Sequence, residues 1–528
     1  MTTLQPVLID GQWKQAQSPA GTFSAVNPAA KAPLKDIYPI SSFTEVGLAL
    51  AAGHQAVTEL RAVSADEIAR FLDIFADMIE ARSPALIEMA HLETALPKEP
   101  RLQSVELPRT IDQLRQAAQA CRDRSWCRAT IDTRLNIRSK HGPLSGPVVI
   151  FGPNNFPFAF NSIAGGDFAA AIAAGNPVIA KSNPGHPGTT KIFAEAAFEA
   201  VQKNGLPQAM VQLLYHFQPE DGLRLVAHPL VGATAFTGSR PSGLRLKEAA
   251  DKAGKPIYLE MSSLNPVFIL PGALKERLDL VAKELVNSCT MGAGQFCTKP
   301  GLVVLIKEKL SEAFFQAVKR YFQEAPSGFL LSEQLLSAIK AAIEKMKENG
   351  AEIVIGGQEI HRPGYCFANT LLRVSGDTFL GNPEALQTEA FGAVSLFVFA
   401  RDIAQMKEIA ASIEGSLTGT IYSHSQTEDE SSYGLIEPML RCKVGRLLND
   451  KMPTGVAVTP AMNHGGPFPA TGHPGFTAVG IPASILRFTA LHCYDNVRPH
   501  RLPLELQDKN PTGRTWRLID GEWTQQDI

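Results

Sequence analysis

The sequence lacks a strong net charge, a long apolar run and a basic leader. Its 50 Lys and Arg residues nearly balance 52 Asp and Glu residues, so the chain has no general attraction for nucleic acid or anionic membranes. Apolar stretches such as residues 147–151 and 302–306 have only strand length, whereas roughly 20 residues are needed to span a bilayer. Residues 1–13 contain no basic region followed by an apolar run. We therefore expect a protein that is neither secreted nor inserted, with no nucleic-acid or membrane partner.

Cysteine is also scarce. The chain has 7 cysteines, scattered along its length, and none shows the C-x-x-C spacing of zinc or redox sites. This usage fits a reducing compartment, so we expect a cytoplasmic protein with no metal site. A length of 528 residues and a hydrophobic content of 45% predict a globular chain of roughly two to four domains.

The two ends of the chain carry similar short sequences. Residues 8–13 read Leu-Ile-Asp-Gly-Gln-Trp, and residues 518–523 read Leu-Ile-Asp-Gly-Glu-Trp. Asp-Gly favours a tight hairpin turn because both residues tolerate positive φ. We expect a small β hairpin at each end. Two copies of six residues do not make a repeat protein, and coincidence explains them equally well.

Helical periodicity begins near Ser64. Ser64 and Glu67 have capping-box spacing, and apolar residues then recur every three or four positions as far as residue 79. A second helix is expected over residues 107–120. Residues 125–141 are polar and β-branched with alternating character, which predicts an exposed two-stranded excursion suited to an oligomer contact.

From residue 148 onward, strands and helices alternate. The expected strands are residues 148–151, 178–180, 233–236 and 257–259, and the expected helices are residues 163–174, 186–203 and 243–252. Such alternation predicts an α/β fold with a doubly wound parallel sheet, whose ligands bind at the carboxyl ends of the strands. A second α/β series begins near residue 265 and includes apolar runs at residues 302–306, 353–355 and 394–398.

Special residues follow several of these strands. They are Asn155, Lys181, Gly238, Ser239 and Glu260. Their convergence at one edge of a sheet predicts a cofactor site. Each polar residue also has an ordinary interpretation: Asn155 as a turn residue, Lys181 as a solvated lysine and Glu260 as a surface carboxylate. The loop after Gly238 opens a helix whose N-terminus can attract a phosphate, although it is not the G-x-G-x-x-G motif.

Cys297 is a candidate nucleophile. It is surrounded by small residues, and Gly292 and Gly294 allow backbone N–H groups to approach an adduct closely. A thiolate is well suited to attack a carbonyl carbon. The alternative is a small buried hydrophobic residue, as most free cysteines are, and this stretch alone leaves both interpretations open.

Ordered motifs over almost the whole chain resemble the aldehyde dehydrogenase superfamily. They are Asn155-Phe-Pro157, Lys181, Phe236-Thr-Gly-Ser239, Leu259-Glu260, Gly294-Gln-x-Cys297 and Glu389-x-Phe-Gly392. Further segments resemble the NADP-preferring α-ketoglutaric semialdehyde (2,5-dioxovalerate) dehydrogenases. These segments are Glu93-Thr-Ala-Leu-Pro97, Arg109-Thr-x-x-Gln-Leu-Arg115, residues 160–167, residues 185–188, His464-Gly-Gly-Pro467 and residues 516–523.

The resemblance implies a role for each motif. Cys297 would attack the aldehyde carbon, and the amide of Asn155 with the backbone N–H of Cys297 would hold the oxyanion of the thiohemiacetal. After hydride transfer, Glu260 would activate the water that hydrolyses the thioester. The implied cofactor residues are Lys181 and Glu389 at the two riboses, Ser182 next to Lys181, Gly238 and Ser239 at a phosphate, and Phe391 beside the nicotinamide.

Departures from the family pattern bear on the cofactor and the pocket. Many members have a carboxylate at the position of Pro184, where it binds the hydroxyls of the adenosine ribose. A carboxylate would repel a 2′-phosphate, so its absence predicts NADP as the better cofactor, with NAD possible. Asn154 replaces the usual aromatic residue before the oxyanion asparagine, and Ser262-Ser263 replace the usual glycine pair after the general base.

The substrate implied by the resemblance is α-ketoglutaric semialdehyde, which carries a carboxylate at its far end. Arg109 is the candidate partner because a planar guanidinium suits a carboxylate, and a surface helix position is the alternative. The implied apolar walls are Phe156, Ile163 and Phe468. Two other hypotheses remain: a broader aldehyde dehydrogenase acting on succinic or glutaric semialdehyde or medium-chain aldehydes, and a non-catalytic binding protein on the same scaffold. An enzyme that passes the thioester to coenzyme A is disfavoured by the presence of Glu260.

The resemblance also implies a three-part organisation. Residues 1–127 and 142–259 would form a discontinuous, Rossmann-type cofactor domain, and residues 260–455 a catalytic domain. Residues 128–141 and 485–528 would form a small β oligomerisation extension, with residues 456–484 returning near the active site. Such an extension normally joins subunits, so we expect a homodimer or homotetramer.

Overall fold

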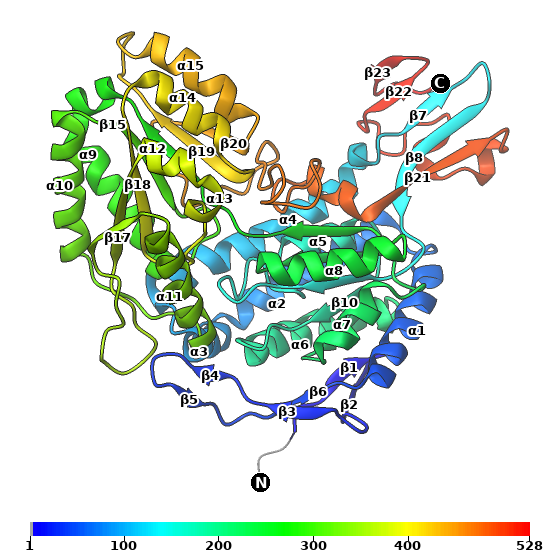
Figure 1. Ribbon diagram of the computed structural model, residues 1–528. Helices are drawn as coiled ribbons and strands as arrows, with labels where there is room; N and C mark the ends of the chain where they lie inside the picture. Colours follow the sequence, from blue (N-terminus) through cyan, green and yellow to red (C-terminus); the bar gives the residue numbers. More distant parts are fainter. Residues whose placement is uncertain (1–3) are drawn as a thin grey trace.

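Two seven-stranded sheets with helices on both faces organise the chain (Figure 1). The computed structural model describes residues 4–528. The first sheet has the order β13 (Ile257–Glu260), β12 (Ala233–Thr237), β9 (Val148–Phe151), β10 (Val178–Lys181), β11 (Val211–Leu214), β1 (Val7–Ile9) and β2 (Gln12–Lys14). The strands from β13 to β11 are parallel, and β1 and β2 add to them antiparallel. The doubly wound α/β unit is therefore confirmed.

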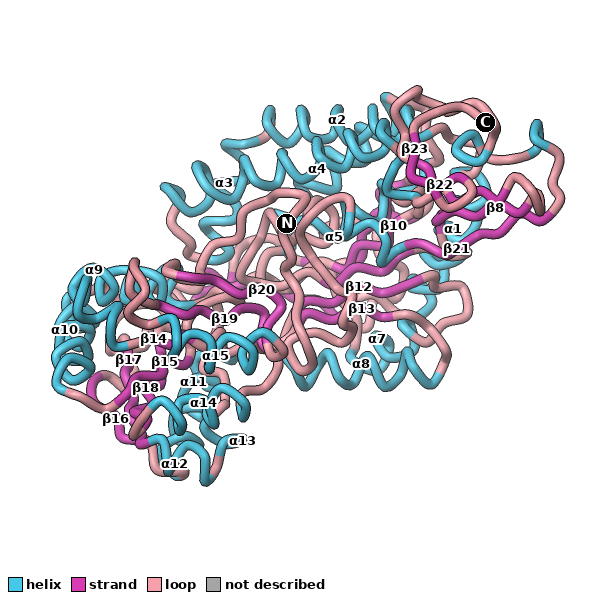
Figure 2. Tube along the Cα trace, turned by 90° about the horizontal axis from the view of Figure 1, so that it is seen from above, coloured by secondary structure: helices cyan, strands magenta, loops and turns pink. Residues whose placement is uncertain are grey.

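Helices cover both faces of this sheet. They are α1 (Phe43–Leu60), α2 (Ala65–Ala81), α3 (Ser83–Thr94), α4 (Leu107–Asp123), α5 (Gly166–Ala173), α6 (Pro187–Lys203), α7 (Pro219–Val226) and α8 (Arg240–Lys252). Figure 2 shows α2 and α4 on one side of the sheet and α7 and α8 on the other. The Val- and Ile-rich strands, covered on both faces, form one large core with the helices.

Local sequence explains where helix α2 begins. Ser64 accepts a hydrogen bond from the backbone N–H of Glu67, and the Glu67 carboxylate accepts one from the N–H of Ser64 at 2.8 Å. This is the capping box that the spacing predicts. The apolar face that follows, including Phe71 and Phe75, is fully buried and packs against α4, α5 and α6.

Two helix starts differ from the sequence-based expectation. The helix expected from residue 163 begins at Gly166, because residues 158–165 form hydrogen-bonded turns, with the N–H of Gly165 donating to the carbonyl of Asn161 at 2.8 Å. The helix expected from residue 243 begins at Arg240, because Ser239 has the extended conformation of an N-cap and Pro241 fits the first turn. Strand β11 and helix α7 were not predicted from the sequence.

The second sheet has the order β16 (Glu352–Ile355), β17 (Thr370–Ser375), β18 (Val394–Ala400), β15 (Leu302–Ile306), β14 (Val267–Ile269), β19 (Ser416–Tyr422) and β20 (Val444–Asn449). All neighbours are parallel except β16, which pairs antiparallel with β17. Its helices are α9 (Pro271–Thr290), α10 (Lys309–Glu324), α11 (Glu333–Glu348), α12 (Gly376–Gly381), α13 (Pro383–Leu386), α14 (Ile403–Ser412) and α15 (Glu430–Arg441). Separate apolar cores line its two faces.

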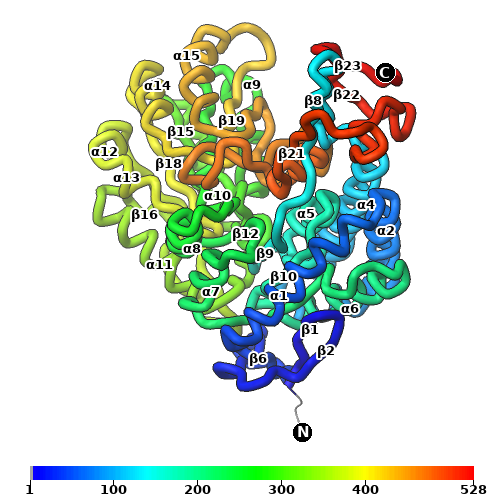
Figure 3. The backbone as a smooth tube through the Cα atoms, turned by 90° about the vertical axis from the view of Figure 1, so that its right-hand side faces the viewer, coloured from blue at the N-terminus to red at the C-terminus, as the bar shows by residue number. Residues whose placement is uncertain are grey.

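A five-stranded β extension projects from the first unit. Its order is β21 (Thr489–Asp495), β8 (Ile137–Pro143), β7 (Thr130–Asp132), β22 (Arg517–Ile519) and β23 (Glu522–Thr524). The two-stranded excursion and both terminal hairpins are confirmed, with Leu8 opposite Trp13 and Leu518 opposite Trp523. The two hairpins join different sheets at opposite ends of the molecule (Figure 3). Among the helices of residues 4–528, none has the length and apolarity to cross a membrane.

The register of the first sheet brings the special strand ends together. Lys181 on β10 lies opposite Phe151, which in turn lies opposite Phe236 on β12. Glu260, the last residue of β13, lies opposite Thr237. The predicted convergence at the carboxyl edge of the sheet is therefore confirmed.

Candidate active site

Cys297 lies in a tight loop between α9 and β15. The loop has Gly294 at a φ of +74°, and a Cβ there would lie 2.2 Å from the backbone of Gly392. The buried ammonium of Lys299 donates to the backbone carbonyls of Ala390 and Val394, at 3.3 Å and 2.6 Å. The cysteine loop is thereby fastened to the segment that carries Glu389 and Phe391.

Cys297, Glu260 and His464 meet in one cluster. Nε2 of His464 lies 3.4 Å from Sγ of Cys297 and 3.0 Å from Oε1 of Glu260. Sγ, Nε2 and a Glu260 carboxylate oxygen all lie within 4.8 Å of one another. Glu260 and His464 are buried, and Cys297 is partly exposed. Glu260 is thus not a surface carboxylate, and a thiol, an imidazole and a carboxylate are in contact.

The surroundings of Cys297 disfavour its thiolate in the resting state. Burial, followed by the negative charge of Glu260, raises the pKa of the Cys297 thiol well above its ordinary value. The guanidinium of Arg109 acts in the opposite direction.

Asn155 is held with its side chain toward the cysteine loop. Its Nδ2 donates to the carbonyl of Gln295 at 2.9 Å, which uses one of its two amide hydrogens. Arg101 donates to the backbone carbonyl of Asn155 at 2.9 Å and is ion-paired to Glu106. The other carboxylate oxygen of Glu106 accepts from the backbone N–H groups of Phe158 and Ala159. This buried pair fixes the loop that presents Asn155.

An aromatic cluster lies beside Cys297 and His464. Its buried members include Phe156, Phe160, Phe296 and Phe476. The rings of Phe156 and Phe296 have centroids 5.2 Å apart, and the ring of Phe160 lies 5.8 Å from the ring of His464. Segments far apart in the sequence therefore combine into an apolar wall next to Cys297.

Arg109 lies over this aromatic cluster. Its guanidinium carbon is 5.2 Å from the ring centroid of Phe160 and 5.8 Å from that of Phe156. Its Nε and Nη2 are buried and find no hydrogen-bond partner among residues 4–528. Burial lowers the pKa of Arg109, while Glu106 and Cys297 raise it. Arg109 is thus a half-buried residue with unused hydrogen-bond donors at the site. Its interpretation as a surface helix residue is excluded.

Two of the expected wall residues lie elsewhere. Ile163 is fully buried in the core of the first unit. Its turn is held against that core by the hydrogen bonds of Asn161, so its side chain packs inward. Phe468 is 63% exposed and has no place in the aromatic cluster. Phe156 is the one of the three implied walls that lies beside the catalytic residues.

The candidate cofactor residues lie along the carboxyl edge of the first sheet and across from it. Lys181 is half-buried, and burial lowers the pKa of its ammonium to about 8. Ser182 is buried beside it. Ser239 is the N-cap of the 13-residue helix α8 and makes no side-chain capping bond. The backbone N–H of Gly238 donates to the carbonyl of Glu260, which ties this loop to the catalytic strand.

Glu389 faces this edge from the second unit. Its Oε1 accepts a hydrogen bond from the backbone N–H of Ser263 at 3.3 Å, and burial raises the pKa of its carboxyl. Ser263 also bonds Asn265 and the N–H of Leu417. The Ser262-Ser263 pair, which departs from the family pattern, thus anchors Glu389. Phe391 is half-buried in the same segment.

The family model for the aldehyde dehydrogenase family matches residues 13–434. The chain belongs to the aldehyde dehydrogenase family. α-Ketoglutaric semialdehyde dehydrogenase 2 of Azospirillum brasilense is 39% identical over 515 residues, which are 95% of this dehydrogenase and 96% of that one. The α-ketoglutaric semialdehyde dehydrogenase of Acinetobacter baylyi is 36% identical over 531 residues, 98% of each chain. The resemblance stated from the motifs is confirmed.

Solved structures confirm the fold of this dehydrogenase. Aldehyde dehydrogenase C of Pseudomonas syringae, in a complex with NAD+ and octanal, has a TM-score of 0.80 at 20% identity and covers 94% of this chain and 98% of its own. A 3,6-anhydro-L-galactose dehydrogenase in complex with NADP has a TM-score of 0.79 at 19% identity and covers 93% of this chain and 99% of its own.

The sequence alone did not indicate that His464, Arg101 and Glu106 belong to the candidate site. The motif His464-Gly-Gly-Pro467 marks its segment, but nothing local indicates that this imidazole reaches Cys297 over a separation of 167 residues. Arg101 and Glu106 lie in a polar stretch without a distinctive pattern. Their involvement is evident only from their burial in the folded chain, where their side chains are 7% and 0% exposed.

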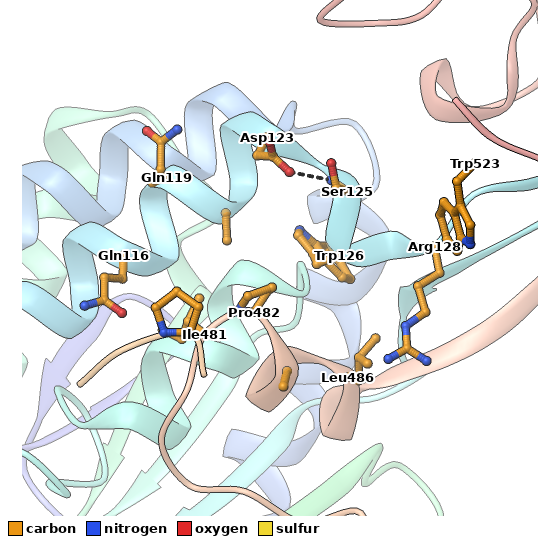
Figure 4. Close-up of a pocket in the computed structure, with 13 residues that line it drawn as sticks. Gln116, Gln119, Asp123, Ser125, Trp126, Arg128, Ile481, Pro482, Leu486 and Trp523 are labelled. Carbon is orange, nitrogen blue, oxygen red and sulfur yellow. Dashed lines mark hydrogen bonds between the residues drawn. The ribbon is translucent and has the colours of Figure 1, made fainter. Parts of the chain in front are cut away.

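A separate surface pocket of the dehydrogenase has a volume of about 600 Å³ (Figure 4). It lies between α4 and the segment that leads into β21, and its lining includes Gln116, Trp126, Pro482 and Trp523. The indole Nε1 of Trp126 is buried without a hydrogen-bond partner, and Trp523 is 56% exposed. None of the lining residues belongs to the catalytic cluster.

Proposed function

We propose that this dehydrogenase oxidises α-ketoglutaric semialdehyde to α-ketoglutarate, with NADP as the better cofactor. The observation that carries the proposal is Arg109, whose buried Nε and Nη2 have no partner while its guanidinium lies over Phe156 and Phe160. A substrate carboxylate would satisfy these donors, since unpaired buried donors are costly. The names of the relatives from Azospirillum brasilense and Acinetobacter baylyi support the same substrate.

A second arginine near Cys297 is less suited to this role. Arg446 also interacts electrostatically with the Cys297 thiol, and burial lowers its pKa. Its guanidinium already donates to the carbonyls of Pro453 at 2.6 Å and Gly455 at 3.3 Å. Arg109 is therefore the proposed partner of the carboxylate.

The first chemical step is attack by Cys297 on the aldehyde carbon. The thiol proton passes to the His464–Glu260 pair, whose Nε2 lies 3.4 Å from Sγ. The aldehyde oxygen becomes an oxyanion, which accepts the second amide hydrogen of Asn155 and the backbone N–H of Cys297. These donors need no reorganisation, because Asn155 is already fixed through Arg101 and Glu106.

The residues at the carboxyl edge of the first sheet fit a dinucleotide. The Lys181 ammonium makes no hydrogen bond or ion pair with any residue of 4–528, so it is free for ribose hydroxyls. The N-terminus of α8 at Ser239 presents N–H groups for a phosphate. Glu389 would hold the second ribose, with Phe391 beside the nicotinamide. A nicotinamide dinucleotide held by these residues would supply the acceptor for the hydride that leaves the thiohemiacetal carbon.

Hydrolysis of the resulting thioester is assigned to Glu260. Its Oε2 is buried and has no hydrogen-bond partner, so it can accept the proton of an attacking water. A carboxylate in this position favours hydrolysis over transfer to coenzyme A. A non-catalytic protein would have no need for a nucleophile, an oxyanion donor and a base in one cluster.

NADP preference rests on the loop after β10. Pro184 is exposed there and brings no negative charge, whereas Lys181 and its lone ammonium lie nearby in the chain. A 2′-phosphate would meet no carboxylate at this position. NAD remains usable, because the same Lys181 also suits free ribose hydroxyls.

We further propose that the β extension joins subunits into a homodimer or homotetramer. Apolar side chains are exposed on it, including Leu491, Trp516 and Trp523, which are 67%, 48% and 56% exposed. Strand β21 has β8 on one side and no described strand on the other, so its backbone groups are available for pairing. Burial of these features in a subunit interface would account for their exposure in one chain.

The test is formation of reduced cofactor by the purified protein. α-Ketoglutaric, succinic and glutaric semialdehydes and hexanal are each assayed with NADP and with NAD. The highest kcat/KM is expected for α-ketoglutaric semialdehyde with NADP. Equal kcat/KM for hexanal would support the broader aldehyde dehydrogenase, and no activity with any pair would support a non-catalytic protein.

A further inference from the structure

The catalytic cluster has the donor atoms of a zinc site. Its thiol, imidazole and carboxylate come from Cys297, His464 and Glu260, and the three donor atoms lie within 4.8 Å of one another. These three side-chain types are the ones that bind Zn²⁺ in proteins, and three protein ligands with an open fourth position are typical of non-structural zinc sites. Their scattered positions explain why cysteine spacing predicts no metal site.

We propose that Cys297, His464 and Glu260 form an inhibitory zinc site, in which bound Zn²⁺ blocks the nucleophile of the dehydrogenase. A thiolate with an imidazole selects a borderline-soft ion such as Zn²⁺ over Mg²⁺ or Ca²⁺, which prefer oxygen ligands. The loss of activity on binding rests on the proposed function of Cys297. The binding of Zn²⁺ itself does not depend on that function.

The distances suit a tetrahedral ion. Zinc bonds of about 2.0 to 2.3 Å place neighbouring ligand atoms about 3.3 to 3.6 Å apart. Sγ of Cys297 is 3.4 Å from Nε2 of His464, and Nε2 is 3.0 Å from Oε1 of Glu260. Shifts of a few tenths of an ångström would therefore seat the ion. The second carboxylate oxygen, Oε2 of Glu260, is buried without a partner among residues 4–528, so it is available as a further donor to the ion.

The three ligands are held by rigid surroundings. Glu260 ends β13 and forms a backbone bridge with Thr471. The N–H of His464 donates to Oγ1 of Thr477 at 2.9 Å, and Nδ2 of Asn265 donates to the carbonyl of Cys297 at 2.8 Å. Little ordering is therefore needed when the ion binds, and preorganisation favours affinity.

The charges and protons balance. The Zn²⁺–sulfur bond forms as the thiol of Cys297 loses its proton to the solvent, and the neutral imidazole of His464 and the carboxylate of Glu260 donate lone pairs. One thiolate and one carboxylate then neutralise the two positive charges of the ion. The cations of Arg109 and Arg446 lie near enough to influence Cys297, and their charges oppose binding of the ion.

The direct test is a spectroscopic titration with Co²⁺ as a probe of the zinc site. Chelator-treated, full-length protein is titrated in the absence of substrate and cofactor. We expect a near-ultraviolet thiolate-to-cobalt band and the visible bands of a four-coordinate ion, both removed by one equivalent of Zn²⁺. Cys297→Ser should abolish the thiolate band, and His464→Gln should weaken Zn²⁺ binding by about 100-fold. Glu260→Gln provides a second ligand variant if one of the others fails to fold.

An exposed cysteine provides the matched control. Cys442 and Cys493 are exposed and lie outside the cluster. The Cys442→Ser variant should retain the thiolate band and full activity without metal, and Cys493 is left unchanged because it lies on β21, the strand proposed to join subunits. Loss of the band in this variant, or unchanged Zn²⁺ affinity in His464→Gln, would overturn the proposal.

Alkylation and activity measurements distinguish the binding of Zn²⁺ at the cluster from the inhibition of aldehyde oxidation. One equivalent of Zn²⁺ should protect Cys297 from iodoacetamide, as measured by peptide mass spectrometry, and a chelator should restore both reactivity and aldehyde oxidation. Zn²⁺ binding at the cluster in a protein without dehydrogenase activity would refute the proposed function while supporting the site. Activity that persists at saturating Zn²⁺ would refute inhibition.

Discussion

Nε2 of His464 lies 3.4 Å from Sγ of Cys297, although 167 residues separate them in the sequence. The same nitrogen lies 3.0 Å from Oε1 of Glu260. It can accept the thiol proton or donate a proton to the carboxylate, but not both at once. His464 therefore couples the nucleophile to the residue proposed to activate water.

His464→Gln tests this coupling. Glutamine keeps a donor toward Glu260 but cannot accept and return a proton as imidazole does, so kcat should fall by about 100-fold while KM for the aldehyde changes little. The pH dependence of kcat/KM should shift as well. His473→Gln, an exposed histidine of the same segment, serves as the control. Equal losses in both variants would show that His464 has only a structural role.

The thiol pKa of Cys297 can be followed by alkylation. Because burial and the charge of Glu260 raise this pKa, the iodoacetamide rate at Cys297 should be slow at neutral pH and still rise in alkaline buffer. Glu260→Gln removes one cause of the raised pKa, so its rate profile should shift to lower pH. Arg109→Met removes an opposing charge, so its profile should shift to higher pH. Identical profiles in all three proteins would contradict the charge assignments.

Much of the first unit could be predicted from the sequence. The strand at residues 148–151 and the strand ends at Lys181 and Glu260 follow from apolar runs bounded by turn residues, and parallel pairing then requires the strand ends to meet. The helix expected from residue 163 was wrong at its start because hydrogen bonds of the turn around Asn161 override helix propensity there. Ile163 consequently packs into the core and not along a substrate path.

The parts that could not be predicted depend on tertiary contacts. Phe156, Phe296 and Phe476 read as separate apolar residues, and only the fold brings them into one aromatic cluster. The surroundings of Arg109 and His464 are likewise formed by segments far apart in the sequence. No local pattern therefore indicates which arginine keeps unused hydrogen-bond donors. Sequence motifs point to Cys297 as the candidate nucleophile, whereas the surroundings of Arg109 are seen only in the structure.

The buried Arg101–Glu106 pair should control both stability and Asn155. Glu106→Gln leaves Arg101 without its buried counter-charge, so the free energy of unfolding should fall by about 3 kcal/mol and kcat should fall with it. Chemical denaturation and steady-state kinetics measure the two effects. Glu88→Gln breaks an exposed pair with Lys98 in the same region and should change neither quantity appreciably. A full-activity Glu106→Gln variant would contradict the positioning role.

The loop after β10 should set cofactor choice. Pro184→Glu would place a carboxylate where it repels a 2′-phosphate and can bind ribose hydroxyls, so the ratio of kcat/KM with NADP to that with NAD should fall about 10-fold or more. Pro184→Gln, which lacks the charge, should alter the ratio less. A parent enzyme that already prefers NAD, or a ratio unchanged by Pro184→Glu, would contradict the proposed NADP preference.

The most direct measurement compares kcat/KM for α-ketoglutaric semialdehyde and for pentanal, an uncharged aldehyde of equal length, in the parent enzyme and in Arg109→Met. Loss of the carboxylate partner should lower kcat/KM for the semialdehyde by about 10- to 100-fold, chiefly through KM, and leave that for pentanal nearly unchanged. Arg446→Met, the matched control, should affect both aldehydes alike. Equal effects of Arg109→Met on the two aldehydes would contradict recognition of a substrate carboxylate by Arg109.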